Sequence, residues 1–377
     1  MKALLAICSA VAISFSSIVF LAGCAGLSSV SNSAAAPPPQ GTSPSHGTFV
    51  YVRNHPASGG NTSGFRMNAD GTLTAVPGSP FSIVGNLAVS GSFLVVANND
   101  SVTSFRIDAS SGSLNQAGVA MANSSSAIAA DATSVYVGGQ ASDGSNVIYT
   151  FSIAANGSLT ANTGSPFFFN NSCTCETAAA MAIMNGILFV SGIGLKNNGE
   201  VALYRSQAGV LVNMQSTVTT EIDRAAIHPS GSFAYGVDWS PGDIVGFTID
   251  ATGKPGQAFV ILDDGLGRFQ DVAIDPSGKF LLAIDETPND SRITVFSVNL
   301  TTGALAEIGA PVSTGEIGGH GIRFDASGRF VIVSHGDTLF AANDVMVFRF
   351  DTTSGALTKV QSAPTGQNPD TIVIATF

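Results

Sequence analysis

Charged side chains are scarce in this chain, and those that could do chemistry gather at two recurring kinds of place. Only 11% of the 377 residues are charged. One group stands just before short apolar runs: Asp223, Arg224, Gln270, Asp271, His320 and Asp370. The other stands just after apolar runs: Arg53, His55, Asn98, Asn99, Asp100, Asp238, Trp239, Asp285, Glu286, His335 and Asp337. Carboxylates and imidazoles can activate water, and guanidinium groups stabilise oxyanions, so one hypothesis is a hydrolytic site. The alternative is that these polar loops are simply solvated.

Five residues in or beside these groups are candidates for catalysis. Glu286, Asp271 or His320 would act as the base, and Arg224 or Arg268 would stabilise the oxyanion. The other candidates are predicted to line the opening of a ligand-binding site, here called the mouth, on one face of the protein. They are Arg53, His55, Asp223, Asp238, Trp239, Asp285, His335 and Asp370.

Other kinds of chemistry find little support in the sequence. The five His residues are isolated, so we predict no metal site and expect no cofactor. The alternative is Ca²⁺ or Mg²⁺ held by carboxylates at the mouth. The chain has no Walker loop and no Gly-x-Ser-x-Gly motif. A net charge of −11 argues against nucleic acid as a partner, because that partner needs a positive surface.

A repeat of 42 to 53 residues organises the chain. Its first motif is a small turn before a large apolar residue: Phe49, Phe93, Val135, Leu188, Phe233, Phe280 and Phe330. Its second motif is an aromatic strand end: Phe65, Phe105, Phe151, Tyr204, Phe247, Phe296 and Phe348. A turn glycine follows each of these aromatics: Gly71, Gly112, Gly157, Gly209, Gly253, Gly303 and Gly355. Seven repeats at matched positions indicate seven copies of one structural unit.

Each unit is predicted to hold four antiparallel strands. In one unit the strands are expected at 271–275, 280–284, 293–298 and near 305–308. The turn Pro276-Ser277-Gly278 separates the first two strands, since Pro presets φ and Gly accepts a positive φ. His228 stands where Asp275 and Asp325 stand in later units, so we interpret it as a turn-capping residue on the face opposite the mouth. Seven such units predict an all-β, seven-bladed β-propeller.

The two ends of the repeat region are expected to close the ring. The first unit begins at a second strand, residues 48–52, with no innermost strand before it. The last segment, residues 371–377, has the pattern of an innermost strand with no blade after it. Pairing these two segments would complete the first blade and remove exposed sheet edges.

The first 46 residues do not share the repeat. Lys2 followed by the apolar stretch 3–22 is typical of an export signal, and a transmembrane helix is the alternative. Leu21-Ala22-Gly23-Cys24 resembles a bacterial lipoprotein signal, which implies cleavage after residue 23 and a lipid on Cys24. No aspartate follows Cys24, so resemblance to Gram-negative lipoproteins implies the outer membrane. Residues 24–46 are expected to be a Ser/Ala/Pro-rich tether, and residues 47–377 the propeller.

Two cysteines remain after such processing. Cys173 and Cys175 lie in the longest insertion between units. An oxidising envelope favours a local disulfide between them, although the i,i+2 spacing demands a bent backbone. The alternative is a pair of thiols that bind a metal together with Glu176.

The repeat resembles the seven-bladed lactonase family, which includes propeller-type 6-phosphogluconolactonases. The resemblance rests on Ile274-Asp275-Pro276-Ser277-Gly278-Lys279-Phe280 and on Phe348-Arg349-Phe350-Asp351 with Gly355-Ala356-Leu357. The family's functional pattern is Gly-Pro-Arg-His before one strand and Asn-Glu after the next. Asp285-Glu286 stands at the Asn-Glu position, so the resemblance carries Glu286 over, whereas Gln270 and Asp271 stand where Arg-His would be. In the next unit, Gly318-Gly319-His320-Gly321 is a shifted form of the pattern.

Three functional hypotheses follow. The first is an envelope-anchored propeller that binds a small molecule, a glycan or a protein partner at its mouth. The second, implied by the resemblance, is a lactone hydrolase, and the third is a structural surface protein. We expect a monomer that is attached to the membrane through Cys24.

Overall fold

The computed structural model describes residues 47–55, 59–123, 125–168, 175–194, 199–219, 222–238, 242–261, 268–336 and 343–377. All of them belong to one compact unit, Pro44–Phe377. The signal, the tether, Cys24, Cys173 and Trp239 lie outside the described residues, as does the side chain of Cys175. In the described part of the chain, no helix has the length and apolar composition needed to cross a membrane.

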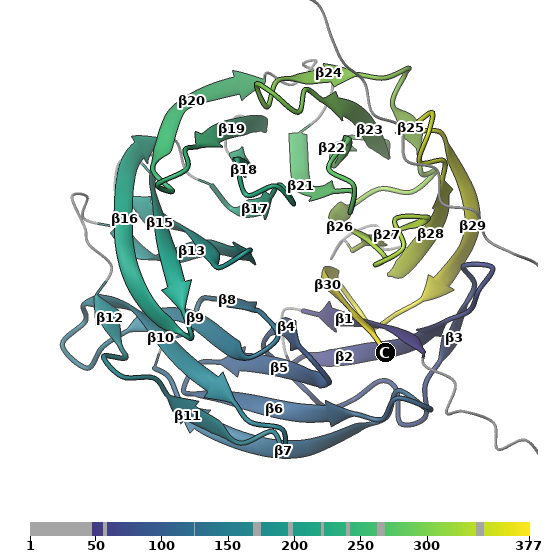
Figure 1. Ribbon diagram of the computed structural model, residues 1–377. Coiled ribbons are helices and arrows are strands. Elements are labelled where there is room, and N and C mark those ends of the chain that lie inside the picture. Colours follow the sequence, from purple (N-terminus) through teal and green to yellow (C-terminus); the bar gives the residue numbers. More distant parts are fainter. Residues whose placement is uncertain are drawn as a thin grey trace, which may run out of the picture. The chain divides into compact units, whose positions relative to one another are not determined.

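Seven antiparallel sheets form a ring, and each sheet is one blade (Figure 1). The first blade contains β1 (Thr48–Asn54), β2 (Asn61–Met67), β3 (Leu73–Ala75) and β30 (Pro369–Thr376). The second contains β4 (Asn86–Ser90), β5 (Phe93–Asn98), β6 (Ser101–Ile107) and β7 (Leu114–Met121). The third contains β8 (Ala127–Ala130), β9 (Ser134–Gln140), β10 (Asn146–Ile153), β11 (Leu159–Ala161) and β12 (Phe167–Phe168).

The remaining blades follow the same order. The fourth contains β13 (Cys175–Met184), β14 (Ile187–Gly194), β15 (Gly199–Gln207) and β16 (Val210–Thr219). The fifth contains β17 (Arg224–Ile227), β18 (Phe233–Asp238), β19 (Asp243–Ile249) and β20 (Pro255–Ile261). The sixth contains β21 (Arg268–Ile274), β22 (Phe280–Thr287), β23 (Asp290–Val298), β24 (Leu305–Glu307) and β25 (Val312–Ser313). The seventh contains β26 (Gly319–Phe324), β27 (Phe330–His335), β28 (Asp344–Phe350) and β29 (Leu357–Pro364).

The structure confirms both the seven-bladed propeller and its closure. β1 pairs antiparallel with β30, from Thr48 opposite Thr376 to Asn54 opposite Pro369. Figure 1 shows this pair as adjacent purple and yellow strands. The strands expected in the sixth blade are present, and β21, β22 and β23 extend a few residues further toward the mouth than the sequence indicated.

The hydrophobic core lies between neighbouring blades rather than inside one of them. Seven clusters of buried apolar side chains are found in the described residues, one at each contact between adjacent blades. The repeated aromatics belong to these clusters; Phe280 and Phe348, for example, pack together between the sixth and seventh blades. Each blade therefore buries its apolar faces only when both neighbours are in place.

Candidate functional site at the mouth

Both predicted groups of polar residues lie at the same end of the ring. Each innermost strand begins where the second strand of its blade ends, because the two are antiparallel: Arg268 lies opposite Glu286, and Gly319 lies opposite His335. We call this end the mouth. The other end carries the turns between the first and second strands. His228 lies there, as expected: Ser230 N donates to its Nδ1, and its Nε2 is 2.8 Å from Gly278 O in the next blade. A Cβ on Gly278, whose φ is +74°, would meet this imidazole at 2.3 Å.

Three mouth residues owe their position to β-bulges, which were not predicted from the sequence. The register of β21 on β22 skips Gln270, that of β26 on β27 skips His320, and that of β30 on β1 skips Asp370. A bulge adds one residue to a strand and changes the direction of its side chain. The glycines that flank His320 were the one sequence signal for such an irregularity.

Four polar residues from three consecutive blades share a small cavity of about 210 Å³ at the mouth. Its lining residues are Asp223, Arg224, Gln270 and His320. Arg224 and His320 are half-buried, and Gln270 is 9% exposed. The structure thus brings together one predicted base, His320, and one predicted oxyanion partner, Arg224, beside a carboxylate and an amide.

A second cavity of about 720 Å³ adjoins the first, because Arg224 lines both. Its other lining residues come from the first three blades: Arg53, Asn54, His55, Val84, Gly85, Asn86, Ala97, Asn98, Asn99, Ser125 and Ser126. Its polar groups are mainly amides and hydroxyls. A volume of this size falls within the range of small-molecule sites.

Three arginines near the mouth are held by carboxylates. Arg53 Nε donates to Asp370 Oδ1 at 2.7 Å, and its terminal nitrogens contact Asp370 Oδ2 and Asn86 Oδ1. Arg292 Nη2 lies 2.6 Å from Asp285 Oδ2. Arg323 Nη1 lies 2.5 Å from Asp271 Oδ2. In each pair the carboxylate offsets the charge of the guanidinium, so the pair has little net charge.

Burial corrects the expectation that Asp271 could act as the base at an open mouth. Asp271 is 1% exposed. Besides Arg323, its carboxylate accepts hydrogen bonds from Val272 N at 2.9 Å and Ile322 N at 3.2 Å. The carboxylate therefore fastens the sixth blade to the seventh rather than facing a ligand.

Asp238, Asp285 and His335 were also expected to line the mouth, and all three are buried. Asp285 accepts hydrogen bonds from the backbone and side chain of Arg292. At each of these residues the second strand is still paired with the third, with Asp238 opposite Asp243, Asp285 opposite Arg292 and His335 opposite Asp344, so all three belong to the sheets.

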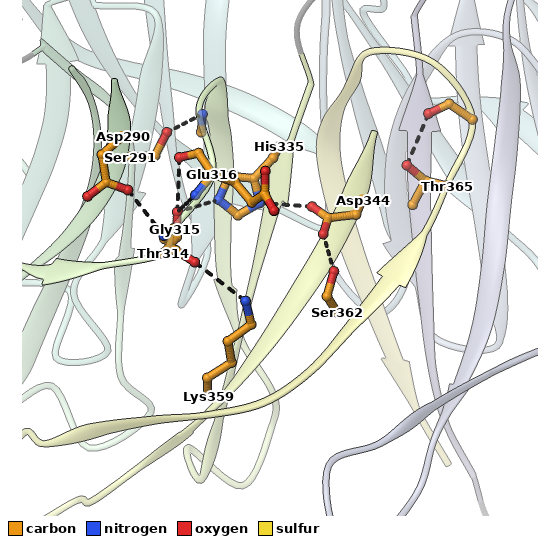
Figure 2. Close-up of polar contacts among 12 residues, drawn as sticks. Asp290, Ser291, Thr314, Gly315, Glu316, His335, Asp344, Lys359, Ser362 and Thr365 are labelled. Carbon is orange, nitrogen blue, oxygen red and sulfur yellow. Dashed lines mark hydrogen bonds and ion pairs between the residues drawn. The ribbon is translucent and has the colours of Figure 1, made fainter. Parts of the chain in front are cut away.

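His335 belongs to a buried chain of polar contacts that links three strands (Figure 2). Its Nε2 lies 3.0 Å from Thr314 Oγ1, and its Nδ1 lies 3.1 Å from Asp344 Oδ1, which leads on to Ser362 through Oδ2. The sequence of hydroxyl, imidazole and carboxylate is that of a hydrolase triad. His335 is 0% exposed and Thr314 is 3% exposed, however, so no substrate reaches them.

Glu286 and Arg268 lie opposite each other at the start of the sixth blade. Glu286 is half-buried and Arg268 is exposed. Neither residue lines the two cavities described above. Glu286, the base that the resemblance implies, therefore lies outside the cavity that His320 lines.

Among the described residues, no three His, Cys, Asp or Glu side chains lie close enough together to hold a metal ion. The pairing of Cys173 with Cys175 remains a prediction, as does the thiol–metal alternative, because neither side chain is described.

Comparisons with known proteins agree with this fold. Residues 267–374 match the family model described as Lactonase, 7-bladed beta-propeller. The 6-phosphogluconolactonase of Formosa agariphila is 30% identical over 146 residues, 35% of this chain and 37% of that protein. The matched chain thus spans little more than a third of that relative's length.

Solved structures extend the similarity over the whole ring. The periplasmic gluconolactonase of Pseudomonas aeruginosa superposes with a TM-score of 0.68 at 18% identity, covering 87% of this chain and 99% of that one. A protein from Lactobacillus plantarum superposes with a TM-score of 0.69 at 18% identity and the same coverage. At such identities the likeness shows the fold alone. Together with the family match, it confirms the resemblance to the seven-bladed lactonases.

Proposed function

We propose that the mouth binds a small lactone and hydrolyses its ring ester. One observation carries the proposal: Arg224 and His320, which supply an oxyanion partner and a base, line one cavity together with Asp223 and Gln270. The proposal also draws support from relatives, since the two named ones are a 6-phosphogluconolactonase and a gluconolactonase.

The residues suggest a simple division of roles. His320 takes a proton from water as the water oxygen bonds to the ring carbonyl carbon. Arg224 stabilises the oxyanion that forms on the carbonyl oxygen. The acyl–oxygen bond of the ring then breaks, and the imidazolium returns its proton to the departing alkoxide. Asp223 and Gln270 orient the lactone, and the product is a hydroxy acid.

The test follows proton release from a panel of sugar and aliphatic lactones by the full chain in detergent. His320→Gln and Arg224→Met should each lower kcat/KM by about 10²-fold or more, as loss of a base or an oxyanion partner does. Glu286→Gln should retain hydrolysis, because Glu286 lies outside the cavity. Loss of hydrolysis in Glu286→Gln with retention in His320→Gln would move the site to the Arg268–Glu286 edge.

A second candidate is ligand binding without turnover. The larger cavity favours it, since amides and hydroxyls such as Asn98, Asn99 and Ser125 suit a sugar or glycan. Calorimetric binding of a sugar to a protein that hydrolyses no lactone would select this candidate. A protein that neither binds a sugar nor hydrolyses a lactone would favour the third hypothesis, a structural surface protein.

We also propose that the chain is exported and anchored through Cys24 as a monomer. Lys2, the apolar stretch after it and the residues that precede Cys24 support this location. A periplasmic relative of the same fold is consistent with it. Labelling of growing cells with an alkyne-tagged palmitate should mark the protein, and Cys24→Ala should abolish the label. An unlabelled wild-type protein would reject the anchor.

A further inference from the structure

The ligand class can be inferred from how charge is arranged around the two cavities, an inference that rests on the proposed function. We propose that the natural ligand is an uncharged, polyhydroxylated lactone, a sugar lactone without a phosphate group. Its ring carbonyl would lie in the small cavity at Arg224 and His320, and its hydroxyl groups in the large one.

Two arginines, Arg53 and Arg224, line the large cavity, and the charge of Arg53 is already neutralised. Arg53 lines this cavity, yet its guanidinium is bound on two sides by Asp370 and on a third by Asn86. The side chains of Arg53 and Asp370 are only 16% and 13% exposed, so this pair is poorly screened by water. Among the described residues that line the two cavities, the only other arginine is Arg224, and its guanidinium would bind the carbonyl oxygen of the lactone.

A phosphate would find no ordinary receptor here. Proteins hold phosphate mainly with bidentate arginines, with lysines or with helix N-termini; among the described residues, no lysine lines either cavity and no helix is present. The electrostatic field is also unfavourable for a phosphate, because the whole chain carries a net charge of −11. A doubly negative group would therefore be repelled from the mouth.

Neutral hydroxyl groups do find receptors. Asn86, Asn98, Asn99, Ser125 and Ser126 supply both donors and acceptors, as a hydroxyl group requires. Asn54 is 1% exposed and lines the same cavity, and its Oδ1 has no hydrogen-bond partner among the described residues. Val84, which is 45% exposed, offers an apolar surface to ring CH groups.

Three lactones tested on the full chain separate these requirements. They are glucono-1,5-lactone, its 6-phosphate, and δ-valerolactone, which has the same ring without hydroxyl groups. We expect kcat/KM for the neutral sugar lactone to exceed that for the phosphate by about tenfold or more, since like charges brought together weaken binding. It should exceed that for δ-valerolactone as well. Added salt should speed hydrolysis of the phosphate and leave the neutral lactone unaffected, because salt screens charge repulsion.

A charge variant makes the test specific to the Arg53–Asp370 pair. Asp370→Asn keeps the side-chain shape and frees the Arg53 charge, so the ratio of phosphorylated to neutral kcat/KM should rise. Asp285→Asn is the matched control, because it frees Arg292, which lines neither cavity. This control should leave the ratio unchanged, and thermal melting verifies that both variants fold.

The outcomes are separable. A phosphorylated lactone hydrolysed as well as the neutral one would overturn the ligand class while leaving hydrolysis in place. If no lactone is hydrolysed, the proposed function fails, and calorimetry with glucono-1,5-lactam and its 6-phosphate decides the ligand class. Binding of the neutral lactam alone would support an uncharged ligand, and equal or tighter binding of the phosphate would reject it.

Discussion

The two ends of the propeller use polar side chains in different ways. At the turn end, side chains bind backbone groups and do so alike from blade to blade: Asp275 accepts from Phe280 N at 2.7 Å, and Asp325 accepts from Phe330 N at 2.8 Å. At the mouth, side chains bind one another instead, within the first blade in the Arg53–Asp370 pair and between the sixth and seventh blades in the Arg323–Asp271 pair.

This difference between the two ends explains why one set of contacts recurs along the repeat and the other does not. Backbone groups are present in every blade, so a side chain that binds them can recur unchanged along a repeat. A pair of side chains needs a particular partner in a particular place, so each mouth contact belongs to its own blades. The turn end therefore carries the repeat, and the mouth carries what is specific to this protein.

Removing the closure should have the largest effect on this arrangement. A chain truncated before Asn368 loses β30, the innermost strand of the first blade and the partner of β1. The first and seventh blades then expose their shared apolar cluster, which includes Val50 and Ile332. We expect insoluble protein, measured as the fraction recovered after centrifugation. A soluble truncate that melts cooperatively would show that the ring stands without this strand.

Breaking a mouth ion pair should come next. Arg323→Met leaves the Asp271 carboxylate, whose side chain is 2% exposed, without its cation. Stranding a buried charge typically costs about 3–5 kcal/mol of unfolding free energy. Urea denaturation measures the loss, and Arg268→Met, at an exposed residue, serves as the control.

The double variant Asp271→Asn with Arg323→Met should recover part of that loss, because no unpaired charge remains. A double variant as unstable as Arg323→Met alone would mean that packing of the arginine, and not its charge, holds the two blades together.

A turn-end side chain should give the smallest effect, visible mainly in acid. Hydrogen bonds from Ser110 and Ser111 lower the pKa of Asp108 from 3.8 to about 2. The folded chain thus takes up this proton at lower pH than the unfolded chain, so the stabilisation present above pH 4 is lost as pH falls toward 2.

Melting temperatures measured between pH 5 and pH 2 test this. Asp108→Asn should show a shallower decline than the wild type, and Ser110→Ala, which removes the largest cause of the shift, should lie between them. Identical declines in all three proteins would remove Asp108 from the acid response.

Much of the fold could be predicted from local signals. The turn Pro276-Ser277-Gly278 and the apolar run that starts at Phe280 define two strands without reference to the rest of the chain, and β21 and β22 lie there. The same signals placed His228 at the turn end. The site was only partly predictable: Arg224 and His320 do meet in one cavity, whereas Asp271, Asp285 and His335 are buried within the sheets.

The sequence by itself determined the number of blades, the four main strands of each and the closure of the first blade by the last segment, but not the short fifth strands β12 and β25. The blades and strands depend on residue type and spacing within one repeat, and the closure follows because the first unit lacks an innermost strand that the last segment supplies. Only the tertiary structure decided which polar side chains at the mouth can reach a ligand and which are buried or paired with one another. Arg53 and Asp370 are 317 positions apart and meet only because the last strand closes the first blade. Arg323 and Asp271 are 52 positions apart and meet because the seventh blade packs against the sixth. Likewise, the bulges at Gln270 and His320 arise where one strand is registered against another, and that register is a property of the pair of strands.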